Sequence, residues 1–197
     1  MQEQVVWCFG VIEAGGEVNA KDVRDALAKF DKSRPVTLRV NSPGGSVHEA
    51  IAIRSLLSSW PGGVQCQVDG LSASAASFLM TVAKTVAIVE FGSVMIHDCW
   101  GATVGNAADH TSTAEVLDQI SDTIAMAYSQ KTGKSQKVIR DAMRRETWYT
   151  SRGSVEFGLC DVVVGENGAV AAMTTTAARA KLDALQRQLD EAAALIR

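Results

Sequence analysis

The chain has 197 residues, of which 47% are hydrophobic and 21% are charged, which suffices for one globular core with room for a short appendage. Its 19 basic and 22 acidic residues are mixed along the sequence and give a net charge of −3, which argues against a nucleic-acid surface or a polybasic membrane patch. The least polar run, residues 70–89, contains Lys84 and several hydroxyls, and the N-terminus has no basic segment. We therefore expect neither a membrane span nor a signal peptide.

The cysteines lie far apart in apolar settings and form no Cys-x-x-Cys pair. We expect reduced, buried thiols of a cytoplasmic protein rather than a disulfide or a metal site. The four are Cys8, Cys66, Cys99 and Cys160.

The first part of the chain reads as strand, helix, strand. Residues 5–12 form a continuous apolar run typical of a strand, and residues 36–41 alternate toward a Ser-Pro-Gly-Gly turn. Between them Asn19 is placed to cap a helix over residues 20–30 whose apolar side chains share one face. This order is the pattern of a right-handed crossover in a parallel sheet.

The same alternation continues along most of the chain. Unbroken apolar strands separated by helices predict an α/β fold whose sheet is covered on both faces. The further predicted elements are a helix over residues 48–60, a strand over 64–69, a helix over about 73–83, strands over 85–90 and 93–98, helices over about 112–132 and 135–145, a turn at 147–150, a short helix over 151–158 and a last strand over 160–165.

The segment after Thr174 is different, being rich in Ala, Leu, Gln and Arg. Apolar residues at 3-4-3-4 spacing predict a helix there, but they are too few for an independent coiled coil. We therefore expect one domain over residues 1–172 and a helical tail over residues 173–197, which packs on the body or on a neighbouring subunit. A partner-binding zipper is the alternative. The spaced residues are Leu182, Leu185, Leu189, Ala192 and Ile196.

Histidines at the ends of elements are the first candidates for catalytic chemistry, because a serine is a weak nucleophile until a base takes its proton. His97 ends an apolar strand beside Asp98, where an active-site base is expected, with a structural histidine as the alternative. His48 lies in the first turn of a predicted helix, and His110 lies in a polar loop beside Asp109.

Two predicted connections between a strand and a helix add to the set. Residues 41–46, Asn-Ser-Pro-Gly-Gly-Ser, place unhindered N–H groups at a strand end, which suits half of an oxyanion hole or an ordinary connection. Residues 71–77 follow an Asp-Gly and carry Ser72, Ser74 and Ser77 among small and apolar residues. Taken alone, such a serine is more often a packing residue than a nucleophile.

Four ordered segments make the chain resemble a known family. Over about residues 5–165 it is similar to the proteolytic subunit of the Clp protease (ClpP), and especially to the related head maturation proteases of tailed phages and prophages. The resemblance implies a ClpP/crotonase-like α/β fold, a repeated ββα/βαβ spiral with an extended handle that contains the helix at 112–132. The four segments are NSPGGSV at 41–47, GLSAS at 70–74, VMIHD at 94–98 and ETWYTSRGSVEFGLCD at 146–161.

The family's functional residues carry over by position. Its nucleophile falls on Ser74, which follows Gly70 by the expected spacing, and its base falls on His97. The backbone N–H groups of Gly45 and Ala75 match the two donors of the oxyanion hole.

Departures from the family's pattern concern the acid and the neighbours of the nucleophile. The acid position falls on Glu146, where most members have Asp, so Asp98 and Asp109 are alternatives. Ser72 stands where the family usually has Ala. A catalytic lysine is disfavoured because Lys84 lies ten residues after the nucleophile, and the Gly-x-Ser-x-Gly elbow of α/β-hydrolases is absent.

The resemblance implies a serine endopeptidase that forms an acyl-enzyme, acts on polypeptides inside a homo-oligomer of single or stacked rings, and uses no metal or organic cofactor. The phage-like form would process capsid, scaffold or portal proteins. The runner-up is a Clp protease subunit that works with an AAA+ unfoldase; it ranks second because the chain starts close to its first strand. A catalytically silent assembly subunit and a crotonase-type acyl-CoA enzyme are alternatives of other classes.

Overall fold

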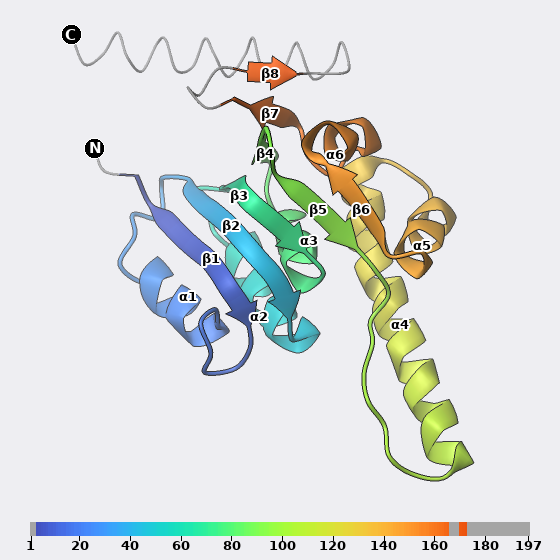
Figure 1. Ribbon diagram of the computed structural model, residues 1–197. Coiled ribbons are helices and arrows are strands. Elements are labelled where there is room, and N and C mark those ends of the chain that lie inside the picture. The colour runs from blue at the N-terminus through green and yellow to red at the C-terminus, as the bar shows by residue number, and fades with distance from the viewer. Residues whose placement is uncertain (1–2, 166–169, 173–197) are drawn as a thin grey trace, which may run out of the picture.

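An eight-stranded, mostly parallel sheet is the centre of the structure, a computed structural model that describes residues 3–165 and 170–172 (Figure 1). Its strands are β1 (Val5–Ile12), β2 (Val36–Gly45), β3 (Val64–Ala73), β4 (Thr85–Val89), β5 (Ser93–Ile96), β6 (Thr147–Thr150), β7 (Val162–Val164) and β8 (Val170–Ala172). The order is β1-β2-β3-β4-β7-β8, with β5 beside β3 and β6 beside β5. The β5–β6 and β7–β8 pairs are antiparallel and the other pairs are parallel, which confirms a mixed α/β fold with a parallel sheet.

Every described helix except α3 starts at a polar residue whose side chain accepts a hydrogen bond from the first turn. Asn19 caps α1 as the sequence predicts, and Ser46 and Asn106 cap α2 and α4, which satisfies N–H groups that a helix leaves without an internal partner. The helices are α1 (Ala20–Leu27), α2 (Val47–Ser58), α3 (Ala75–Met80), α4 (Ala107–Thr132), α5 (Gln136–Arg144) and α6 (Ser151–Phe157).

Strand β3 has different neighbours along its two halves, and this divides the sheet. Residues 65–68 pair with β4, whereas residues 71–73 pair with β5. Strand β5 is therefore placed beside the last residues of β3. Because parallel strands have their carboxyl ends at the same edge of a sheet, the ends of β2, β3 and β5 lie near one another.

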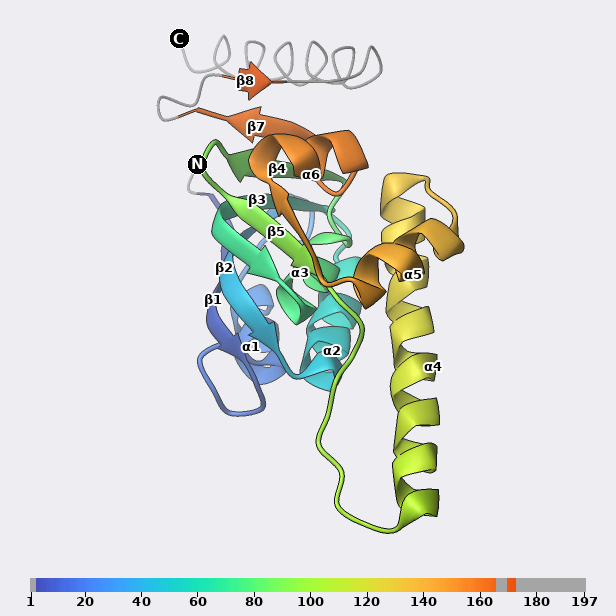
Figure 2. The ribbon, with the colours of Figure 1, turned by 45° about the vertical axis from the view of Figure 1, so that its right-hand side comes forward.

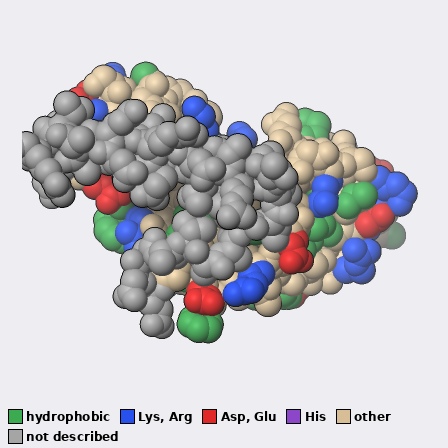
Figure 3. Space-filling view, turned by 90° about the horizontal axis from the view of Figure 1, so that it is seen from above, with side chains coloured by type: hydrophobic (Ala, Val, Ile, Leu, Met, Phe, Trp, Pro, Cys, Tyr) green, Lys and Arg blue, Asp and Glu red, His purple; other side chains and the backbone are tan. Residues whose placement is uncertain are grey.

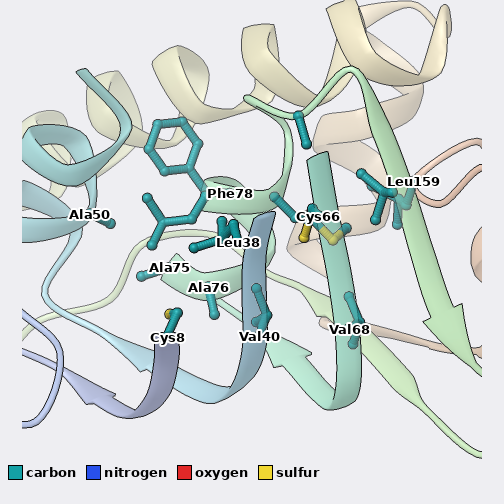
Figure 4. Close-up of a cluster of buried hydrophobic side chains, with 14 of the residues drawn as sticks. Cys8, Leu38, Val40, Ala50, Cys66, Val68, Ala75, Ala76, Phe78 and Leu159 are labelled. Carbon is teal, nitrogen blue, oxygen red and sulfur yellow. The ribbon is translucent and has the colours of Figure 1, made fainter. Parts of the chain in front are cut away.

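The core lies between the sheet and helices α1, α2 and α3. Figure 4 shows Leu38 and Val40 of β2 and Cys66 of β3 lying close to Ala76 and Phe78 of α3, and all five are buried. Full burial of an aliphatic or aromatic side chain contributes roughly 1.5–3 kcal/mol. Helix α3, which begins directly after Ser74, is thus held firmly against the sheet.

The opposite face of the sheet differs from the expectation of cover on both sides. Along β1, the buried Val6 and Cys8 alternate with Trp7 and Phe9, which are 56% and 41% exposed. Such alternation is typical of a strand with one buried face. The sequence pattern did not reveal this alternation of buried and exposed positions, because the exposed Trp7 and Phe9 are apolar as well.

Helix α4 extends well beyond the sheet, with the loop that follows β5 running beside it (Figure 2). Its second half is buried through Ile124, Ala127 and Tyr128, whereas Val116 in its first half is 50% exposed. The helix is therefore buried in its second half, and its apolar residues leave the core toward its start.

Three boundaries differ from the sequence prediction. Strand β2 continues through the predicted Ser-Pro-Gly-Gly turn to Gly45, because Gly44 and Gly45 pair with β1. Strand β3 runs on to Ala73, so α3 covers only residues 75–80 and Lys84 lies beyond that helix. The predicted turn at 147–150 is β6, which pairs along β5.

The polar loop predicted around Asp109 and His110 is wrong, because both lie in the first turn of α4. The side chain of Asp109 accepts a hydrogen bond from the N–H of Asn106, while Asn106 accepts from Asp109 in return. Because of this capping box, α4 begins at Ala107, whereas the sequence predicted a start at about residue 112.

Some predictions lie at or beyond the limits of the described residues. The helical tail over 173–197 lies outside them, and with it the domain division after residue 172.

The cysteines are free thiols, and all but the half-buried Cys99 are buried. No helix among the described residues has the length and apolar character needed to cross a bilayer. Basic and acidic side chains lie interspersed on the described part of the face in Figure 3.

Candidate active site

Ser74 and His97 meet at the carboxyl ends of two neighbouring strands. Ser74 follows the last residue of β3, His97 follows the last residue of β5, and the two strand ends are paired. The Ser74 Oγ and His97 Nε2 atoms are 2.7 Å apart, a hydrogen-bond distance. In this arrangement the imidazole can accept the hydroxyl proton, which is the first requirement for a nucleophilic serine.

The backbone of Ser74 is strained at the turn that leads from β3 into α3. Its φ of 55° and ψ of −125° lie outside the regions that non-glycine residues normally occupy. The N–H of Ser74 donates to the carbonyl of Met95 at 3.0 Å. Because Met95 lies two residues before His97, this bond ties the turn that carries the serine to the strand that carries the histidine.

The N–H of Ala75, the first predicted oxyanion donor, directly follows the serine in the chain. Ala75 is the first residue of α3, so its N–H has no acceptor within that helix. A Cβ on Gly44 would lie 2.9 Å from the Ala75 nitrogen and 2.7 Å from the Cβ of Ser74. Glycine at this position therefore allows β2 to approach the turn closely.

Gly45, the other predicted oxyanion donor, is the last residue of β2 and pairs with Ile12 of β1. Its φ of 143° is one that residues with a side chain rarely adopt. Gly45 borders the cavity that Ser74 and His97 also line. Its N–H remains the predicted second donor to an oxyanion at Ser74.

The predicted acid lies near His97 without a hydrogen bond to it. A Glu146 carboxylate oxygen is 3.8 Å from His97 Nδ1, and the Glu146 side chain is 59% exposed. Its other oxygen accepts from the Trp148 indole at 3.3 Å. Glu146 has a φ of 47°, a left-handed conformation that is uncommon for a residue other than glycine.

The alternative acids are engaged elsewhere. The Asp98 carboxylate accepts from the Arg140 guanidinium at 2.7 Å, and burial raises the pKa of Asp98. Asp109 belongs to the capping box of α4. Among the three acidic residues considered from the sequence, Glu146 is the one that the structure places beside the imidazole.

Ser72 and Ser77 are distinct from the candidate nucleophile. Both are fully buried. The Ser72 hydroxyl lies 3.6 Å from the sulfur of Met80, inside the core. The Ser77 hydroxyl lies 2.8 Å from the Ser74 carbonyl, 2.7 Å from the Met95 carbonyl and 2.7 Å from the Tyr128 hydroxyl. The hydroxyls of Ser77 and Tyr128 therefore stabilise the strained turn through hydrogen bonds.

This hydrogen-bonded pair predicts an unequal effect on stability. Ser77→Ala leaves the buried Tyr128 hydroxyl with only the Ser74 carbonyl at 3.5 Å and should lower the free energy of unfolding by about 1–3 kcal/mol. Tyr128→Phe leaves Ser77 bonded to a carbonyl and should cost about 1 kcal/mol. The double variant should cost less than the sum, because the second change removes a hydroxyl that is already unpaired. Urea unfolding at one protein concentration measures all three; additive losses would contradict the pairing.

A cavity of about 740 Å³ opens beside Ser74 and His97. Met95 of β5 and Leu117 and Ile120 of α4 contribute apolar side chains to its lining. This volume is typical of ligand pockets, and its lining leaves room for an apolar group next to Ser74.

Sequence reasoning did not assign Ser77, Tyr128 or Gly44 to the site. Ser77 was visible in the serine-rich segment, and Gly44 precedes the predicted oxyanion donor. Tyr128 carried no signal, because a tyrosine in the buried half of a helix is ordinary. His48 and His110 remain apart from the serine–histidine pair: His48 borders the cavity from α2, and His110 is exposed on α4.

Comparison with known proteins adds an independent observation. The family model described as Clp protease matches residues 13–167. The ATP-dependent Clp protease proteolytic subunit 3 of Streptomyces coelicolor is 33% identical over 141 residues, which cover 70% of this chain and 64% of that protein. The proteolytic subunit 2 of Mycolicibacterium paratuberculosis is 29% identical over 164 residues, which cover 78% of this chain and 81% of that protein.

Proposed function

Because the chain belongs to the Clp protease family, we propose that it is a serine endopeptidase with Ser74 as nucleophile and His97 as base. The observation that carries this proposal is the 2.7 Å contact between Ser74 Oγ and His97 Nε2 at the mouth of an apolar cavity. The Gly45 and Ala75 N–H groups supply the oxyanion hole. No step needs a metal or an organic cofactor.

The reaction proceeds by acyl transfer. His97 accepts the Ser74 proton as Oγ attacks the carbonyl carbon of the peptide bond, and the two N–H groups stabilise the oxyanion. His97 then donates the proton to the amine that leaves, and an ester remains on Ser74. Water, deprotonated by His97, hydrolyses that ester. Glu146 orients the imidazole through Nδ1 once its carboxylate moves about 1 Å closer, to hydrogen-bond distance.

We assign its substrates to unfolded polypeptides and its working form to a homo-oligomeric, cytoplasmic ring that an AAA+ unfoldase supplies. The names of the relatives, ATP-dependent proteolytic subunits, support this assignment over processing of phage head proteins. Neither relative described above carries a head maturation name, so that role becomes the second candidate. A catalytically silent assembly subunit is the rival of another class.

A fluorophosphonate probe tests the proposal, because it reacts covalently with a serine that a base has activated. The wild-type protein should gain one adduct, which peptide mapping places on Ser74, and His97→Ala should remain unlabelled. Gel filtration and circular dichroism verify that the variant is folded and assembled. A wild-type protein that stays unlabelled in its assembled form would support the silent subunit instead.

A further inference from the structure

Arg140 is a buried cation surrounded by carboxylates from two other elements. Its side chain, on α5, is only 6% exposed. It donates to Asp98, in the segment after β5, at 2.7 Å and to Asp118 of α4, and its Nε lies 3.0 Å from an Asp122 oxygen. One guanidinium thus joins α5 to both α4 and the segment that follows His97.

The Arg140–Asp98 pair is the part of this cluster that is shielded from water. The Asp98 side chain is 29% exposed, compared with 62% for Asp118 and 54% for Asp122. Ion pairs in water contribute little, whereas a shielded pair holds its geometry and is costly to break. Burial raises the pKa of Asp98, and the charges of Arg140 and Arg144 oppose that shift.

This pair lies next to the base and close to the acid. Asp98 is the residue after His97, and its N–H donates to the Met143 carbonyl at 3.3 Å. The same carbonyl accepts from the N–H of Glu146 at 2.9 Å. The last turn of α5 therefore holds both the segment with the imidazole and the residue with the carboxylate, and Arg140 lies one turn earlier on that helix.

We propose that Arg140 is a positioning residue for the proposed hydrolase, which sets the separation of His97 and Glu146 by binding Asp98. Side-chain and backbone bonds together fix α5 against the segment after β5, so the distance between His97 Nδ1 and the Glu146 carboxylate depends on this clamp. The inference rests on the proposed function, since a base and an acid need alignment only if the serine reacts.

The test is a double-variant cycle read by fluorophosphonate labelling of the full chain. Rates of adduct formation at several probe concentrations give kinact and KI separately for the wild type, Arg140→Gln, Glu146→Gln and the double variant. Arg140→Gln should lower kinact by about 10-fold to 100-fold, the size expected for misplacement of about 1 Å, and leave KI unchanged. In the Glu146→Gln background the same change should have almost no further effect, because the alignment it protects is already lost.

A matched control is Lys137→Gln, which removes an exposed cation from the same helix where it pairs with Asp141; it should label at the wild-type rate. If Arg140→Gln does not fold, Asp98→Ala replaces it in both backgrounds, because Arg140 then keeps its two carboxylates on α4. Equal losses in the two Glu146 backgrounds, wild-type labelling of Arg140→Gln, or wild-type labelling of Glu146→Gln would each overturn the inference. A wild-type protein that fails to label would instead overturn the proposed function.

Discussion

Ser74→Ala is expected to reduce hydrolysis of a fluorescently labelled, unfolded polypeptide by a factor of about 10⁴–10⁶, because it removes the only atom that forms the acyl-enzyme. The backbone donors and the cavity remain, so binding of the polypeptide should change little. Such a selective loss of kcat is typical of a residue that acts in the chemical step. The measurement is the initial rate of fluorescence release by the assembled protein at several substrate concentrations.

Ser72→Ala is the matched control for this prediction. Ser72 lies two residues earlier, within β3, and its hydroxyl faces the sulfur of Met80 in the core. Its removal should leave kcat close to the wild-type value, since no atom of this side chain borders the cavity. If Ser72→Ala lost activity as severely as Ser74→Ala, the nucleophile assignment would be in error or the turn would depend on both hydroxyls.

The strands that precede Ser74 and His97 were predictable from the sequence, although β3 ends four residues later than predicted, at Ala73. Apolar runs located β3 and β5, and parallel strands bring their carboxyl ends to one edge. The pairing of these two particular residues came from the family resemblance, since no local pattern links positions 23 apart.

The position of Glu146 relative to His97 was not predictable in this way. It depends on the contact between Arg140 and Asp98, which joins residues 42 apart. It also depends on the Met143 carbonyl, which accepts hydrogen bonds from the N–H groups of both Asp98 and Glu146. Charges that lie on separate elements give no periodic signal. The family resemblance therefore indicated Glu146, with Asp98 and Asp109 as alternatives, and left the distance between the acid and His97 open.

The extended conformation of residues 42–45 was also not predictable from the sequence, because Pro and Gly usually indicate turns. Here Gly44 and Gly45 adopt φ values of 96° and 143° and still pair with Val11 and Ile12 of β1. Pairing with a neighbouring strand prevailed over the local preference of these residues. This long-range pairing also places Gly45 at the end of β2, where it borders the same cavity as the serine.

Gly45→Ala is expected to lower kcat by about 10²–10³-fold, the loss typical of one oxyanion donor. A Cβ at this position would lie 2.2 Å from the Ile12 carbonyl oxygen, so the end of β2 must move away from β1 and carry the amide with it. Gly63→Ala is the control, because Gly63 has a φ of 79° and no atom within 4 Å of the added Cβ; it should lower stability by about 1–2 kcal/mol and leave kcat unchanged. Steady-state kinetics and urea unfolding separate the two effects. If Gly45→Ala kept its kcat, Gly45 would not be a donor to the oxyanion, and equal losses of kcat in both variants would point to general backbone strain.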